Sequence, residues 1–214
     1  RGKLQYVKTA ARLNLLQFFR DISNYDASPF DLVISDFEPL TSRIAARYKL
    51  SSIGIGHQYA FCFDIPVSGA NPLSRWVLHS FAPVDIPIGL HWHHFDQPIL
   101  PPIVPSGLYT GSPFDENKIL VYLPFEHLDD IKAMLEPFSS MQFFVYGISG
   151  LYENIDQGHI HLRPYSRGGF LADLIDCNGV ISNAGFELTS EALQLGKRVL
   201  VKPLRGHSEQ SSTA

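Results

Sequence analysis

The spacing of apolar residues changes along the chain between a helical period and short continuous runs. Residues 3–23 carry apolar side chains every three or four positions, which predicts one amphipathic helix. An apolar run at 31–36 predicts a buried strand that ends in a carboxylate, and helical spacing follows at 39–48. Further strands are predicted at 52–56 and 86–90. This alternation favours a parallel sheet whose sites lie at the carboxyl ends of the strands.

A second series of strands and helices begins at residue 119. It predicts strands at 119–123, 143–146 and 159–162 and a helix at 128–135. Turn-forming residues gather between the two series, namely Pro98, Pro101, Pro102, Pro105, Gly107 and Gly111. We therefore expect an α/β protein of two domains, residues 1–111 and 112–214, each with a parallel sheet.

The stretch from residue 179 to 211 has the strongest pattern in the chain. A short apolar strand at 180–182 leads into a glycine turn at 183–185, a helix at 186–195 and another strand at 199–201. The first N–H groups of a helix have no partner within the helix. A helix that opens on a glycine turn is therefore a candidate anion site. The alternative is an ordinary strand–helix–strand unit whose glycines only make turns.

Polar residues in this stretch suit a ligand rich in hydroxyl groups. Glu191 lies six residues after Gly185, about one and a half turns along the helix. A carboxylate there can reach the hydroxyls of a ribose whose phosphates lie at the helix N-terminus. Glu209 and Gln210 follow the next strand and offer side chains to a further hydroxyl-rich group.

The order and spacing of six residues resemble the nucleotide-sugar half of GT-B glycosyltransferases, both the UDP-glycosyltransferases and the bacterial enzyme that adds N-acetylglucosamine to lipid-linked muramyl pentapeptide. These residues are Gly185, Glu191, Gly196, Pro203, Glu209 and Gln210. The resemblance implies a GT-B fold of two Rossmann-like domains. Because the chain starts without Met and stops where a helix is due, we expect an incomplete N-terminal domain and a truncated C-terminal domain.

The same resemblance implies a donor site in the second domain. Tyr165, twenty residues before Gly185, corresponds to an aromatic residue that stacks on uracil, although a plain surface tyrosine is the alternative. Many UDP-glycosyltransferases have His where this chain has Asn183, so phosphate binding here depends more on backbone N–H groups and the helix dipole. The predicted substrate-binding residues are Tyr165, Asn183, Gly185, Phe186, Glu191, Glu209 and Gln210.

Two residues at strand ends in the first domain are the predicted catalytic residues. Asp36 matches the carboxylate of the His–Asp pair of UDP-glycosyltransferases, whose His belongs to a loop that this chain does not contain. Such a carboxylate orients the imidazole and stabilises its protonated form. The alternative is that Asp36 caps the following helix. His57 ends the next strand and is a candidate base, or else a polar residue lining the site.

Composition narrows the remaining possibilities. The net charge of −4 gives no reason to expect a nucleic-acid partner. An apolar content of 45% is typical of a globular protein, for which we expect a cytoplasmic location, and no apolar run is long enough to cross a bilayer. Peripheral membrane association stays open. Cys62 and Cys177 lie in apolar surroundings, which predicts reduced, buried thiols.

Three neighbouring histidines raise the question of a metal. On a strand His91 and His93 would share a face and His94 would point away, and no cysteine or carboxylate completes a ligand set. We therefore predict no metal site, and GT-B families generally work without a metal or other cofactor.

The resemblance implies an inverting transferase that moves sugar from a nucleotide-diphosphate donor, UDP-linked, to an unknown acceptor, which is a glycan, a lipid or a small molecule. The donor would lie on the second domain and the acceptor in a cleft against the first. The 214 residues alone are expected to be inactive. The alternatives are a hydrolysing UDP-sugar 2-epimerase of the same fold and a non-catalytic protein that binds sugar nucleotides.

Overall fold

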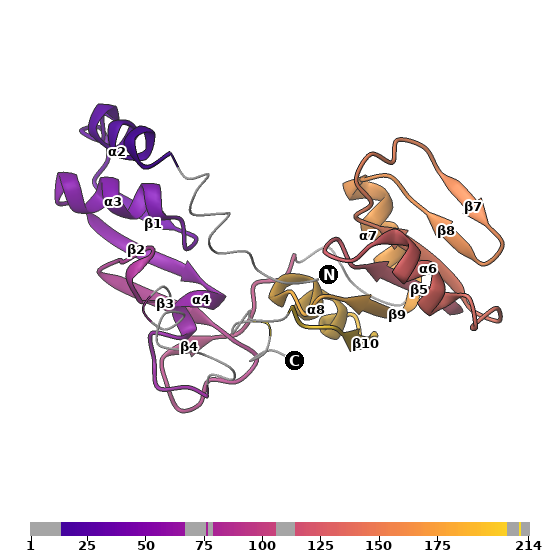
Figure 1. The fold of residues 1–214 in the computed structure, drawn as a ribbon. Helices are drawn as coiled ribbons and strands as arrows, with labels where there is room; N and C mark the ends of the chain where they lie inside the picture. Colours follow the sequence, from indigo (N-terminus) through magenta and orange to yellow (C-terminus); the bar gives the residue numbers. More distant parts are fainter. Residues whose placement is uncertain (1–13, 67–75, 77–78, 106–113, 205–209, 211–214) are drawn as a thin grey trace. The chain divides into compact units, whose positions relative to one another are not determined.

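The computed structural model describes residues 14–66, 76, 79–105, 114–204 and 210. The chain forms two compact units: one extends to Ile103 and is called the N-unit here, and the other begins at Val104 and is called the C-unit (Figure 1). The change from one unit to the other falls within the predicted segment rich in proline and glycine.

The N-unit contains a four-stranded parallel sheet in the order β1-β2-β3-β4. Its elements are α2 (Leu15–Asn24), β1 (Leu32–Ser35), α3 (Pro39–Tyr48), β2 (Ser51–Gly56), α4 (His57–Ala60), β3 (Ile86–Leu90) and β4 (Ile99–Leu100). The predicted strands and the helix at 39–48 are confirmed. The helix predicted at 3–23 is observed from Leu15, and its first part lies outside the described residues.

Helix α3 is capped by Glu38, whose carboxylate accepts hydrogen bonds from the backbone N–H groups of Leu40 at 2.9 Å and Thr41 at 2.8 Å. The alternative role of Asp36 as the cap is therefore wrong. The helix ends at Lys49, which adopts a left-handed φ of 54°.

Two glycines let α4 lie directly against the sheet. A Cβ on Gly54 would lie 2.3 Å from the ring of Tyr59, and one on Gly89 would lie 2.5 Å from the backbone of Ala60. Both approaches are too close for any side chain, so the sequence of β2 and β3 fixes where α4 packs.

The described helices that connect strands of the N-unit sheet, α3 and α4, lie on the face of Gly54, because right-handed connections between strands that advance in one direction stay on one side. The opposite face is mostly aliphatic, and its members follow from the strand register: Leu32, Ile34, Ser51, Ile53, Ile55, Ile86, Ile88, Leu90 and Leu100. Leu32 and Ile34 are exposed, so the prediction that β1 is a buried strand is wrong for this face.

The C-unit contains a six-stranded sheet in the order β10-β9-β5-β6-β8-β7, in which only the β7–β8 pair is antiparallel. Its elements are β5 (Asp115–Tyr122), α6 (Leu128–Leu135), β6 (Gln142–Tyr146), β7 (Ile155–Gln157), β8 (Ile160–Leu162), α7 (Arg167–Asp176), β9 (Cys177–Ser182), α8 (Phe186–Gln194) and β10 (Arg198–Val201). The elements predicted in this half are confirmed, whereas β7 and α7 were not predicted.

The order of the C-unit strands reverses at β5. The chain first adds β6 and β8 on one side of β5, and then returns to add β9 and β10 on the other (Figure 1). Helix α6 consequently packs in the core of Val121 and Val145, while α7 and α8 pack in the core of Leu120 and Val180. Both faces of the sheet are therefore covered, and the switch point lies between β5 and β9.

Candidate nucleotide site

The carboxyl ends of β5 and β9 meet at the switch point, which is where open α/β sheets bind ligands. Helix α8 begins there with Gly185 as its N-cap residue, and no side chain of the described residues caps it. The positive end of the helix dipole therefore favours an anion at this uncapped turn.

Buried polar atoms without a partner lie around the start of α8. Among the residues that the structure describes, Ser182 Oγ, Asn183 Oδ1 and Thr189 Oγ1 make no hydrogen bond, although all three side chains are buried. Buried polar groups in folded proteins are almost always paired with protein or with ordered water. Unpaired atoms at a switch point are thus consistent with a polar ligand.

In the turn before α8, the left-handed conformation that favours glycine is adopted by Ala184 and not by Gly185. Ala184 adopts a left-handed φ of 58°, which is strained for a residue with a side chain. Gly185 has an ordinary φ of −68°, and nothing lies within 4 Å of the position a Cβ would take. The backbone therefore does not require glycine at 185, but the space beside the helix N-terminus is open to a ligand.

Asn183 ties the turn to the neighbouring strand. Its Nδ2 donates to the carbonyl of Lys202 at 3.1 Å, and the N–H of Lys202 donates to the carbonyl of Ser182 at 2.8 Å. The amide group of Asn183 has a second N–H donor, and its predicted hydrogen bond to a diphosphate stays a prediction.

Glu191 is half-buried on α8. Burial raises the pKa of its carboxyl group, repulsion by Glu187 raises it further, and the charge of Arg167 at the start of α7 acts in the opposite direction. The contact of Glu191 with a ribose stays a prediction.

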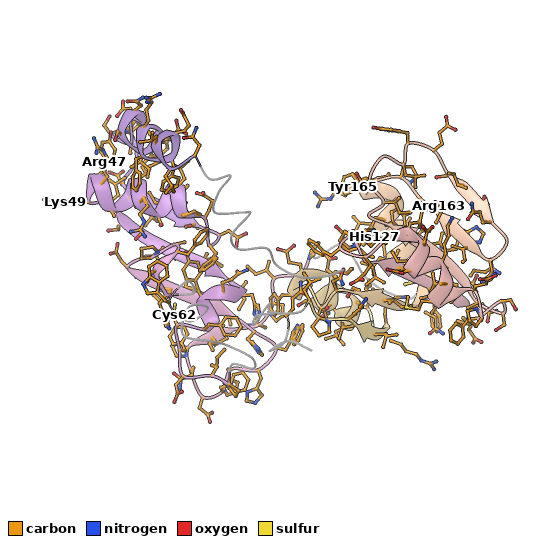
Figure 2. The ribbon with its side chains drawn as sticks, in the orientation of Figure 1. Arg47, Lys49, Cys62, His127, Arg163 and Tyr165 are labelled. Atoms are coloured by element: carbon orange, nitrogen blue, oxygen red, sulfur yellow. The ribbon has the colours of Figure 1, made fainter. Side chains whose placement is uncertain are left out.

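The other predicted donor residues lie in different surroundings. Tyr165 follows β8 and is 86% exposed (Figure 2), so its ring is open to a stacking partner. The side-chain oxygen of Gln210 accepts from the backbone N–H of Leu204 at 2.9 Å. Phe186 is the first residue of α8. Glu209 lies outside the described residues.

An ion pair at this edge was not predicted from the sequence. Glu126, in the loop after β5, and Lys202, directly after β10, approach to 2.7 Å between Oε2 and Nζ. Because β9 lies between β5 and β10 in the sheet, this pair joins the segments that follow the two neighbours of β9. The sequence signal was a charged residue just after each of two apolar strands.

The predicted catalytic residues of the N-unit lie at the ends of neighbouring strands. Asp36 follows β1 and is exposed, and its Oδ1 would lie 2.9 Å from a Cβ on Gly56. His57 is only 4% exposed, and its Nδ1–H donates to the carbonyl of Leu90 at 2.9 Å. Burial lowers the pKa of His57 to about 4, and nearby His91 acts in the same direction. The catalytic roles of both residues stay predictions.

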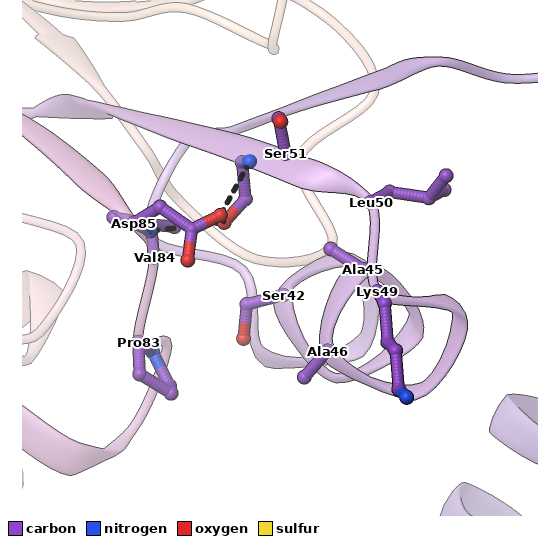
Figure 3. Close-up of a pocket in the computed structure, with 10 residues that line it drawn as sticks. Ser42, Ala45, Ala46, Lys49, Leu50, Ser51, Pro83, Val84 and Asp85 are labelled. Atoms are coloured by element: carbon purple, nitrogen blue, oxygen red, sulfur yellow. Dashed lines mark hydrogen bonds between the residues drawn. The ribbon is translucent and has the colours of Figure 1, made fainter.

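The pocket in Figure 3 lies at the opposite, amino end of the N-unit strands. Its lining includes Lys49 and Asp85, and the Asp85 carboxylate accepts hydrogen bonds from the backbone N–H and the hydroxyl of Ser52, both at 2.9 Å. The pocket contains neither Asp36 nor His57.

The three neighbouring histidines lie in the loop after β3, so the alternation of faces along a strand does not apply to them. The Nδ1 atoms of His91, His93 and His94 accept hydrogen bonds from backbone N–H groups two residues later. Within the described part of the chain, no three or more His, Cys, Asp or Glu side chains form a group that could hold a metal ion.

The two cysteines differ in exposure. Cys177 is buried as predicted, but Cys62 is exposed (Figure 2), so the prediction that both thiols are buried is wrong. No helix among the described residues has the length and apolar character needed to cross a membrane.

Two α/β units with parallel sheets, one with an open helix N-terminus at its switch point, define a class of nucleotide-binding folds. The comparison with protein families then gives the family. The sequence model described as glycosyl transferase family 1 matches residues 93–214, which is more than half of the chain, so the chain belongs to this family. A search of curated proteins gave no significant match.

Solved structures of glycosyltransferases share the fold. SnogD from Streptomyces nogalater matches with a TM-score of 0.56 and 13% identity, covering 98% of this chain and 68% of its own. CalG4, the calicheamicin glycosyltransferase, matches at 0.56 and 12%, covering 97% and 66%. Arabidopsis thaliana UGT89C1, in complex with UDP, matches at 0.51 and 13%, covering 96% and 61%. The fold is thus that of GT-B glycosyltransferases, and the chain spans about two thirds of the length of these structures.

Proposed function

We propose that the C-unit binds a nucleotide-diphosphate sugar, UDP-linked, with its diphosphate at the N-terminus of α8. The protein that contains this unit would transfer the sugar, with inversion at the anomeric carbon, to an acceptor hydroxyl. The family supports sugar transfer, and the UDP complex of the structurally similar UGT89C1 supports the choice of nucleotide. Glu191 would bind the ribose and Tyr165 the base, while Asp36 and His57 remain the candidates for the acceptor side.

One observation carries the proposal: the open space at Gly185 beside unpaired buried polar atoms. A diphosphate there would accept hydrogen bonds from the first N–H groups of α8, which lack a side-chain cap among the described residues. It would also replace missing partners around Ser182. Preorganised N–H groups of this kind stabilise the negative charge that develops on a leaving diphosphate.

Gly185→Ala tests the site without disturbing the fold. The backbone at 185 suits alanine, so thermal stability should stay the same or rise slightly. The new methyl group would occupy the space assigned to the ligand, and UDP affinity should fall about tenfold or more, equivalent to about 1.4 kcal/mol. Titration calorimetry of the 214-residue chain with UDP measures this change.

Gly168→Ala is the matched control. Gly168 lies in the first turn of α7, and nothing is within 4 Å of its Cβ position either. This variant should bind UDP like the unaltered chain. Equal affinities for all three proteins would remove the start of α8 from the nucleotide site, and an unaltered chain that does not bind UDP would contradict the proposed function.

A further inference from the structure

The start of α8 attracts anions less strongly than its position suggests. Its first turn contains the acidic Glu187, and residues 183–185 of the preceding turn carry no positive charge. A nucleoside diphosphate brings two or more negative charges, which the helix dipole offsets only in part. A positively charged side chain near this turn would therefore add much to binding.

Lys202 is fixed beside this turn by two hydrogen bonds that its own backbone groups make. Its N–H donates to Ser182 and its carbonyl accepts from the side chain of Asn183, at 2.8 and 3.1 Å. The side chain then runs to Glu126 in the loop after β5, so the ion pair joins the segments that follow β10 and β5, on either side of β9.

The two members of the ion pair differ in exposure. The side chain of Glu126 is 7% exposed, whereas that of Lys202 is 59% exposed. A buried carboxylate is costly without a cation, so Glu126 holds the ammonium in place. An ammonium has three N–H donors and Glu126 Oε2 occupies one of them. The side chain of Lys202 also reaches solvent, and Glu126 is its ion-pair partner among the described residues.

We propose that Lys202 supplies the positive charge that binds the diphosphate of the donor, and that Glu126 positions it over the end of β9. The inference rests on the proposed function, since it assumes a nucleoside diphosphate at the start of α8. A compact ammonium suits this task because it can contact phosphate oxygens from several directions. In this chain Lys202 provides the charge that Asn183 lacks.

Lys202→Gln tests the role by separating charge from shape. UDP affinity should fall about tenfold, as expected for the loss of a hydrogen bond to a charged group. Affinity for uridine, which has no phosphate, should change less than about twofold. Lys202→Arg should restore most of the UDP affinity, and the dependence of UDP binding on salt should be weaker in Lys202→Gln than in the unaltered chain.

Arg198→Gln is the matched control, because Arg198 lies at the amino end of β10 and Lys202 follows the carboxyl end of the same strand. It removes the same charge and should leave binding of both ligands unchanged. Equal losses for UDP and uridine in Lys202→Gln would show a structural role and overturn the inference. UDP binding that is insensitive to Lys202→Gln would also overturn it while leaving the proposed function intact. Absence of UDP binding by the unaltered chain would overturn both.

Discussion

The two sheets differ in the direction in which the chain adds strands. In the C-unit the order reverses at β5, so helices cover both faces. In the N-unit the described strands advance in one direction from β1 to β4, and the crossovers cover one face. Parallel sheets are normally buried on both sides. Reversal of strand order therefore completes the core, and it also creates the crevice in which a ligand can bind.

The same difference separates the candidate residues of the two units. At the C-unit switch point, Lys202 is hydrogen-bonded to Ser182 and Asn183, which come just before Gly185 in the turn into α8. In the N-unit, Asp36 and His57 also lie at carboxyl ends, but one is exposed and the other is buried. Among the described strands β1 pairs only with β2, so no switch point lies beside Asp36 in this part of the chain.

The largest expected effect is in the C-unit core. Leu120→Ala should lower the free energy of unfolding by about 2–5 kcal/mol, because Leu120 is fully buried and the substitution leaves a cavity. Both tryptophans, Trp76 and Trp92, belong to the N-unit. The loss should therefore appear in the urea transition followed by circular dichroism and not in tryptophan fluorescence. Equal shifts in both signals would show that the units unfold together.

A smaller effect is expected from pH in the N-unit. The pKa of His57 is about 4 in the folded chain and about 6.5 in the unfolded chain, so the unfolded state binds more protons between these values. The stability from this group is complete above pH 6.5 and decreases by about 3 kcal/mol as the pH falls to 4. Burial also lowers the pKa of His91, which acts with the same sign.

Tryptophan fluorescence in urea at pH 7 and pH 4.5 measures this change. His57→Gln removes the titrating group at similar size and should flatten most of the pH dependence. A midpoint that stays constant in the unaltered chain would show that His57 is protonated as readily in the folded state as in the unfolded one.

The sequence was most informative where local pattern decides structure. The strand, turn and helix around Gly185 were predicted because apolar runs and glycines mark them directly. Helix α7 was missed because it opens with Gly168 and Gly169, which are poor helix formers. Its start depends on Ser166, whose hydroxyl accepts from the N–H of Gly169 at 3.2 Å.

Features that depend on the order of strands in the sheet could not be predicted from the sequence pattern. Glu126 and Lys202 are 76 positions apart, and only the placement of β9 between β5 and β10 brings them together. The apolar run at β1 predicted a buried strand because apolar side chains are stabilised by burial. The sequence of a strand does not show which other elements cover that strand. In the structure Ile34 is 62% exposed.

The smallest expected effect tests whether the aliphatic face of the N-unit sheet is covered in solution. Ile34→Ala removes a side chain of nearly the same apolar size as Leu120, but from an exposed position, so no cavity forms. The free energy of unfolding should fall by less than about 1 kcal/mol, since the buried part of the side chain is small. Tryptophan fluorescence in urea reports this unit directly. A loss of 2–5 kcal/mol, equal to that of Leu120→Ala, would mean that another surface covers Ile34 in solution, and the contrast between the two sheets would then disappear.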